Sequence, residues 1–164
     1  AARAAEWAEA LEARARYRSL FDHVPVGLYR TSARGDILEA NAELARLLRY
    51  PDRNALRALK ASGLYARRRD RKRILDGQRD ESVLHASEVE LRRSDGESLW
   101  VEDHARPLRD ASGEIIAYEG SLLDVTERRR LELELRASEE RFRALVQNAS
   151  DVIAVLNDEA SSGT

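Results

Sequence analysis

The sequence contains no cysteine, which excludes disulfides, thiolate metal sites and cysteine nucleophiles. It also lacks any apolar run near the roughly 18 residues that span a membrane, and its N-terminus has no apolar signal core. We therefore expect a cytoplasmic location and no membrane contact in this chain. The 164 residues include no methionine and begin at Ala1, which indicates a piece of a longer protein.

Neither sign of charge predominates. Charged residues make up 35% of the chain, but the net charge is only -2. Interspersed charge of this kind is typical of exposed helices. The stretch 66–73, ARRRDRKR, is the most basic segment, but it has no aromatic interleaving and the chain is net acidic. A solvated helix face is favoured over a nucleic-acid site, and we expect no nucleic-acid partner.

Helix and strand patterns alternate in an order that defines the fold class. Residues 3–21 are rich in Ala, Glu, Arg and Leu and predict a helix that Pro25 ends. Strands are predicted at 26–31, 36–40, 83–92, 97–108 and 114–123, and short helices fill 42–78, the first capped by Asn41. Two strands, several short helices and three strands predict an α+β domain with an antiparallel sheet and helices on one face.

The C-terminal part repeats an earlier pattern. Leu131, Leu135, Ser138, Phe142 and Leu145 follow a spacing of 4, 3, 4 and 3 residues, as in a coiled-coil seam, although two heptads also fit a single helix on its own domain. The next segment, RFRALVQNASDVIAVLN, is similar to RYRSLFDHVPVGLYRTS near the start. We predict an N-terminal helix (1–20), a domain (21–126), a linker helix (127–145) and a truncated second repeat (146–164).

Several motifs together carry a family resemblance that covers residues 16–126. They are RYRSLFDHVPVGLYRT, GDILEAN, RRSDGESLWVE, ARPLRDASGEIIAYEGSLLDVT and the following TERRRLELELRASEERFR. With these motifs the chain resembles the PAS sensory domain of bacterial multidomain signalling proteins. The resemblance implies a five-stranded antiparallel sheet with short helices on one face enclosing a small pocket, and flanking helices at both ends.

The resemblance also implies how such a domain is used. Asp124 and Thr126 would end the last strand and couple the domain to an output helix, whose start their short polar side chains can also cap. Implied partners are a histidine kinase or diguanylate cyclase domain in the same chain and a second copy in a parallel homodimer. We expect no catalysis in this chain, because no glycine-rich elbow presents a nucleophile and Ser87 lies in the middle of a strand.

Two cofactor classes of the family are excluded by composition. Covalent flavin and hydroxycinnamoyl chromophores are attached in relatives through a Cys that this chain lacks. Haem-binding relatives place a histidine on the helix before the third strand, here about 66–77, which has none; haem is therefore disfavoured. We expect no metal site, and the sequence leaves the cofactor unknown.

The turn between the third and fourth strands has two possible registers. A two-residue turn at Asp95-Gly96 would place Val89 and Leu91 on one face with Trp100. A three-residue loop with a glycine bulge instead gathers aliphatic residues on one face and is the register that we predict. That face then contains His85, Ser87, Val89, Leu91, Leu99, Val101, Asp103 and Ala105.

In this register His85, Ser87 and Asp103 form a polar group on an apolar wall. A buried carboxylate is costly unless it is paired. Asp103 could therefore hold a small polar or cationic ligand, with His85 and Ser87 as further pocket groups. Alternatively, His85 and Asp103 satisfy each other or lie at a wet sheet edge.

The predicted outer face of the sheet carries Trp100. A tryptophan there indicates packing against a flanking helix of the same or a second chain, and the stripe of Trp7, Leu20 and Phe21 is the candidate. Two functions remain open: a ligand sensor, or a ligand-free dimerisation and spacing module. Long aliphatic side chains that fill the pocket would favour the second; the candidates are Leu44, Leu47, Leu56, Leu59, Leu64, Ile74 and Leu75.

Overall fold

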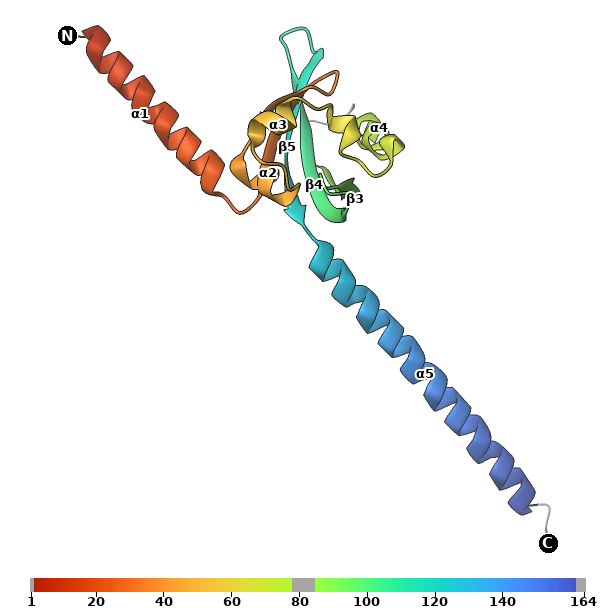
Figure 1. Ribbon diagram of the computed structural model, residues 1–164. Coiled ribbons are helices and arrows are strands. Elements are labelled where there is room, and N and C mark those ends of the chain that lie inside the picture. The colour runs from red at the N-terminus through yellow and green to blue at the C-terminus, as the bar shows by residue number, and fades with distance from the viewer. Residues whose placement is uncertain (1, 78–84, 162–164) are drawn as a thin grey trace. The chain divides into compact units, whose positions relative to one another are not determined.

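A five-stranded antiparallel sheet forms the centre of the chain in the computed structural model, which describes residues 2–77 and 85–161 (Figure 1). The strand order is β2-β1-β5-β4-β3. This confirms the predicted α+β architecture. The strands are β1 (Gly27–Ser32), β2 (Ile37–Ala40), β3 (His85–Arg92), β4 (Ser98–Arg109) and β5 (Ile115–Asp124).

Short helices lie between the second and third strands and pack on one face of the sheet (Figure 1). The chain divides into two compact units, one ending at Val125 and one beginning at Thr126. The helices of the first unit are α1 (Ala2–His23), α2 (Ala42–Leu47), α3 (Arg53–Arg57), the 3-10 helix η1 (Ala61–Gly63) and α4 (Arg68–Gly77). The helix α1 thus runs three residues beyond the predicted boundary at residue 20 and ends before Pro25.

Asn41 joins the entry segment, the first strand and the first short helix. Its side-chain oxygen caps α2 by accepting from the Leu44 N–H at 2.9 Å, and it accepts from the Leu28 N–H at the same distance. Its amide nitrogen donates to the carbonyls of Phe21 and Val26 at 2.8 and 2.9 Å. The residue is fully buried, so all these bonds form away from water. The predicted cap is therefore also a central tie of the fold.

The register of β3 and β4 is the one predicted from the three-residue loop. Val89 pairs with Val101 and Leu91 with Leu99. Gly96 has φ +88 and donates its N–H to the Arg93 carbonyl at 2.9 Å, which closes the loop. A positive φ suits glycine because it has no Cβ. The loop thereby directs the aliphatic residues of both strands to the helix-covered face.

The core lies between that face and the helices. Large side chains from both layers are almost completely removed from solvent, and this apolar burial stabilises the helix-on-sheet packing. Each has a relative exposure of 2% or less: Leu48 and Leu56 from the helical segment and Leu91, Leu99 and Val101 from the sheet.

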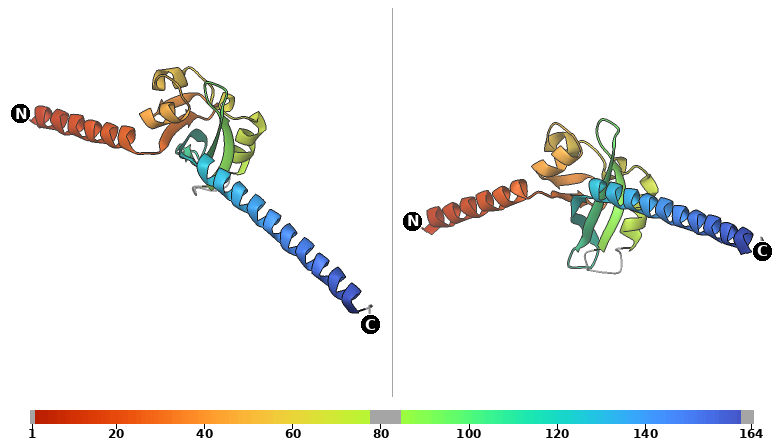
Figure 2. Two further views of the ribbon diagram at one scale, coloured as in Figure 1. Left: turned by 60° about the horizontal axis from the view of Figure 1, so that its bottom comes forward. Right: turned by 90° about the horizontal axis from the view of Figure 1, so that it is seen from below.

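The second unit is the single helix α5 (Thr126–Ser161) (Figure 2). Arg130 forms ion pairs with Glu127 and Glu134 at 2.7 Å along its surface. The sequence predicts a linker helix that stops at 145 and a strand near 151–157, whereas the helix continues through both. A lone strand has no sheet to pair with, while a helix already started extends by one internal hydrogen bond per residue. That 146–164 begin a second repeat stays a prediction.

Candidate functional site

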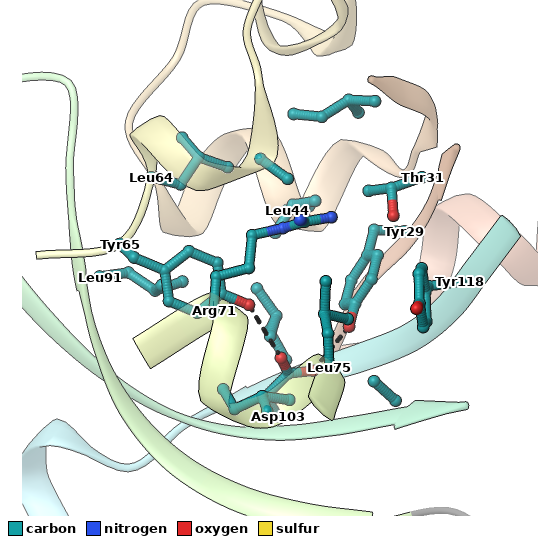
Figure 3. Close-up of a pocket in the computed structure, with 15 residues that line it drawn as sticks. Tyr29, Thr31, Leu44, Leu64, Tyr65, Arg71, Leu75, Leu91, Asp103 and Tyr118 are labelled. Carbon is teal, nitrogen blue, oxygen red and sulfur yellow. Dashed lines mark hydrogen bonds between the residues drawn. The ribbon is translucent and has the colours of Figure 1, made fainter. Parts of the chain in front are cut away.

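A small cavity of about 40 Å³ lies between the sheet and the helices of the first unit (Figure 3). Its wall is mainly aliphatic and aromatic, with Thr31, Arg71 and Asp103 as its polar members besides the tyrosine hydroxyls. This is the composition of a site for a small molecule: an apolar surround with a few fixed polar groups. The other lining residues are Tyr29, Ile37, Leu44, Ala61, Leu64, Tyr65, Ile74, Leu75, Leu91, Ala105, Tyr118 and Leu122.

Asp103 forms the most buried polar group of the cavity, with 1% relative exposure. The hydroxyl of Tyr29, from β1, donates to its Oδ1 at 2.8 Å, and the hydroxyl of Tyr65, from the segment before α4, donates to its Oδ2 at 3.3 Å (Figure 3). Each carboxylate oxygen thus has a donor. Three segments far apart in the sequence meet at this carboxylate. The strands β1 and β4 come together because both flank β5, and the segment of Tyr65 is held nearby by its bridge to Leu91 of β3.

Burial raises the pKa of Asp103 to about 6, and the hydrogen bonds from Tyr29 and Tyr65 oppose this shift. The shift upward means that removal from water outweighs the two donors. Burial and the nearby Asp103 charge in turn raise the pKa of both tyrosines above the usual range. The tyrosines therefore remain proton donors at neutral pH.

The raised pKa of Asp103 predicts a pH-dependent stability. Its folded value of about 6 lies above the unfolded 3.8, so the carboxyl favours the folded state most below pH 4 and loses that contribution as pH rises through 6. The difference of about two pH units corresponds to about 3 kcal/mol. Asp103→Asn should therefore gain up to about this amount relative to the parent between pH 4 and 7.5, measured by urea unfolding.

The two proteins are compared by how their free energy of unfolding changes with pH, because the amide that Asp103→Asn introduces can also shift that free energy by a constant amount at every pH. Glu114→Gln, which changes an exposed carboxyl, provides the control. Parallel stability curves for Asp103→Asn and the parent across this range would contradict a raised pKa at Asp103.

Of the three predicted pocket residues, the structure places Asp103 in the cavity wall. Ser87 is paired with Asp103 across β3 and β4 but is not among the lining residues. His85 pairs with Ala105 on the same ladder, and its side chain falls outside what the structure describes. Asp103 accepts hydrogen bonds from two tyrosines, and its predicted pairing with His85 stays a prediction. Sequence reasoning missed Tyr29 and Tyr65 because their partner lies 74 and 38 residues away.

The predicted joint lies at the end of β5. The Asp124 carboxylate forms an ion pair with Arg93 at 3.6 Å, and the Val125 N–H donates to the Trp100 carbonyl at 2.9 Å. Thr126 is the first residue of α5. Contacts to the β3–β4 loop and to β4 thus fix the chain immediately before the helix begins.

The residues predicted for a dimer interface are separated in the first unit. Trp7 and Leu20, both on α1, are 71% and 65% exposed. Phe21 stacks on Tyr17 with ring centroids 5.6 Å apart and borders a hollow on the outer face of the sheet. Trp100 is half-buried in another hollow, beside Arg69 of α4. Within the chain, Trp100 and Phe21 of the predicted stripe border different hollows, and their contact across a second chain stays a prediction.

Within residues 2–77 and 85–161, no group of three or more His, Asp or Glu side chains could hold a metal ion. In the same part of the chain, no helix combines the length and the apolar character needed to cross a bilayer.

The cavity, the sheet order and the short covering helices define a small-molecule-sized pocket in an α+β domain. The family model described as "PAS fold" matches residues 15–125, which is more than half of the chain. The protein therefore belongs to the PAS family. The comparison with curated proteins gives no match.

Solved structures of other PAS domains have the same fold. A PAS domain from Colwellia psychrerythraea is 20% identical with a TM-score of 0.60, covering 71% of this chain and 98% of that one. A sensory box histidine kinase/response regulator structure from Burkholderia thailandensis is 21% identical with a TM-score of 0.59, covering 79% and 98%. A PAS domain of a LuxR-family transcriptional regulator from the same species, in complex with ethanol, is 24% identical with a TM-score of 0.57, covering 67% and 97%.

Proposed function

We propose that this chain is a sensory module of a histidine kinase or diguanylate cyclase type of signalling protein. In this proposal, a small molecule in the cavity changes the arrangement of β4 and β5, and the segment from Asp124 to Thr126 passes the change to α5. The output domain would lie in the same protein. The chain itself would bind and relay, without catalysis.

One observation carries the proposal: the polar group of the cavity and the joint lie on the same two strands. Asp103 pairs with Leu122, and two residues further along the ladder Val101 pairs with Asp124. Trp100, next on β4, accepts the hydrogen bond from Val125. A ligand that prefers one arrangement of Asp103 would therefore act on strands that also hold the start of α5.

The likeness to domains from other signalling proteins supports a cavity that accepts small molecules. One PAS domain of similar fold was solved in complex with ethanol, a molecule small enough for a cavity of about 40 Å³. We infer that this cavity takes a ligand of comparable size or slightly larger, in a wall whose shape Asp103 fixes through its bonds to Tyr29 and Tyr65.

A homodimer is part of the proposal. The heptad residues of α5 are exposed, from 51% for Leu131 to 70% for Phe142. Exposed apolar residues at heptad spacing are the pattern by which two parallel helices associate. A dimer would let a change at both joints act on one pair of helices.

A ligand-free dimerisation and spacing module is the second candidate. The specific observation in its favour is that Leu44, Leu64, Ile74 and Leu75 all line the cavity, and that the volume left between them is small. In that function the domain would hold α5 at a set distance from a neighbouring domain and respond to that neighbour alone.

Native and denaturing mass spectrometry of the purified chain separates the two candidates. A small molecule that is present in the native spectrum and lost on denaturation is the expected result for a sensor. Its occupancy should fall in Asp103→Val, which removes the acceptor that holds the Tyr29 and Tyr65 hydroxyls in the cavity wall, and remain in Glu114→Gln. A dimer that carries no small molecule, in chain purified from several expression media, would favour the spacing module.

The predicted interface residue Trp100 gives a separate test of self-association. Trp100→Ala is expected to raise the dimer dissociation constant about tenfold, since a half-buried tryptophan at an interface carries a large share of the binding energy. Sedimentation equilibrium measures it, with Tyr50→Ala, a change at a half-buried aromatic elsewhere, as the comparison. An unchanged dissociation constant would remove Trp100 from the interface.

A further inference from the structure

Arg71 of α4 is the cationic member of the cavity wall, and none of the residues that the structure describes forms a hydrogen bond or ion pair with it. Its guanidinium nitrogens lie 3.2 and 3.3 Å from the position that a Cβ on Gly35 would occupy. Because Gly35 has no side chain, the guanidinium can occupy the space next to it. Arg71 is half-buried. Burial raises the pKa of Asp103, and the Arg71 charge is a minor opposing influence at longer range. A guanidinium without a directly bonded acceptor at a partly dehydrated site is unfavourable.

A second polar group at the cavity forms no side-chain hydrogen bond to residues 2–77 or 85–161. Thr31 is 3% exposed and lines the cavity, and its hydroxyl forms no hydrogen bond with the described part of the chain. Figure 3 shows the Arg71 guanidinium directed toward Thr31 and away from Asp103. The Arg71 side of the cavity therefore offers donors without acceptors, whereas the donors around Asp103 are already used.

The wall between these two ends is apolar. Leu44, Leu75 and Leu122 line the cavity together with Ala105. Asp103 carries negative charge at neutral pH and would repel an anion placed next to it. An anionic group is therefore favoured at Arg71 and an aliphatic group toward the interior.

We propose that the cavity binds a small aliphatic carboxylate, such as acetate or propionate, with its carboxylate on Arg71 and Thr31 and its alkyl chain among the leucines. A guanidinium can donate two parallel hydrogen bonds to one carboxylate, and the Thr31 hydroxyl can donate a third. This inference rests on the proposed sensory function and names the ligand class of that same cavity.

Small molecules of similar shape but different charge test whether the cavity recognises a carboxylate. Propionate, the neutral propionamide and 1-propanol are titrated into the whole chain, and binding is followed by amide chemical-shift changes at residues lining the cavity. Propionate should bind at least about tenfold more tightly than propionamide, because a charge-assisted pair is stronger than a neutral hydrogen bond.

Substitutions on α4 and β1 assign the effect to residues. Arg71→Met keeps the length of the side chain and should weaken propionate binding about tenfold or more while leaving 1-propanol binding unchanged. Thr31→Val, nearly isosteric, should weaken propionate binding to a smaller extent. Arg73→Met makes the same change at an exposed site on α4, where Arg73 pairs with Asp70, and should leave binding unchanged. Thermal unfolding confirms that each variant is folded.

The outcomes separate this inference from the proposed function. Equal affinity for propionate and propionamide, or full propionate binding in Arg71→Met, would overturn the carboxylate assignment. Binding of 1-propanol alone would overturn it as well but leave the sensory function standing. If no probe shifts the cavity residues and the purified chain carries no small molecule, both proposals fail.

Discussion

Replacing Asn41 with alanine is expected to lower the free energy of unfolding of the first unit by about 3 kcal/mol. Asn41 is fully buried, and its side chain supplies the partner for the N–H groups of Leu28 and Leu44 and the carbonyls of Phe21 and Val26. Alanine would leave these groups without their partner in a place that water does not reach. Urea unfolding monitored by circular dichroism and tryptophan fluorescence measures the loss.

Asp52→Ala is the matched control. Asp52 caps α3 by accepting from the Ala55 N–H at 2.9 Å, but the cap is exposed. Water can replace it, and we expect a loss of about 1 kcal/mol or less. If Asn41→Ala cost no more than Asp52→Ala, Asn41 would act as an ordinary helix cap and not as the tie between the entry segment and the sheet.

Gly120→Ala is expected to cost about 3 kcal/mol and to disturb the cavity at the same time. A Cβ at this position would lie 2.3 Å from the His104 carbonyl oxygen, 2.8 Å from the Tyr29 hydroxyl and 3.0 Å from the Ala105 Cα. Two of these atoms are backbone atoms of β4, so relief requires movement of the strand that carries Asp103. The Tyr29 hydroxyl, which crosses β5 beside Gly120 to reach Asp103, would be displaced as well.

Two variants interpret this result. Gly63→Ala, where a Cβ would meet no atom within 4 Å, should change stability by less than about 1 kcal/mol. Tyr29→Phe in the Gly120→Ala background removes the hydroxyl contact but not the backbone contact. We therefore expect the double variant to lose less free energy of unfolding than the sum of the losses of the two single variants, but still to be less stable than the parent. Unchanged stability in Gly120→Ala would show that β4 and β5 can separate freely at this point.

The β3–β4 register could be predicted because its determinants are local. Aliphatic residues alternate on both strands, and the loop contains Gly96, so only one register gathers Val89, Leu91 and Leu99 on one face. The observed pairing agrees with this reasoning. The same reasoning predicted that the Asp103 carboxyl lies on the helix-covered face, since strand alternation assigns a face to every residue of a strand once the face of one residue is known.

The partners of Asp103 could not be predicted in this way. Tyr29 reaches it from β1 across β5, which requires the strand order and the small size of Gly120. Tyr65 reaches it from an irregular segment that pairs with the edge of β3. No periodicity links either tyrosine to residue 103, whereas His85 lies on the same predicted face and could be proposed as a partner from the sequence.

At the end of the chain, hydrogen bonding within one helix prevailed over a strand-like sequence pattern. The apolar segment 151–157 is similar to a strand of the first unit, yet it lies in α5. A strand depends on hydrogen bonds to neighbouring strands, and the described residues of the second unit contain no other strand. A helix satisfies its backbone within one segment, so the same residues continue the helix that precedes them.

The sequence alone therefore determined the elements of the first unit, the faces of its strands, the β3–β4 register and the inward position of Asp103, because strand alternation, caps and turns depend on residues close together in the chain. Only the tertiary structure decided which side chains meet in the cavity. Asp103 accepts hydrogen bonds from Tyr29 and Tyr65, and the Arg71 guanidinium lies against Gly35. These contacts join residues that are distant in sequence, and the packing of helices on the sheet alone brings them together.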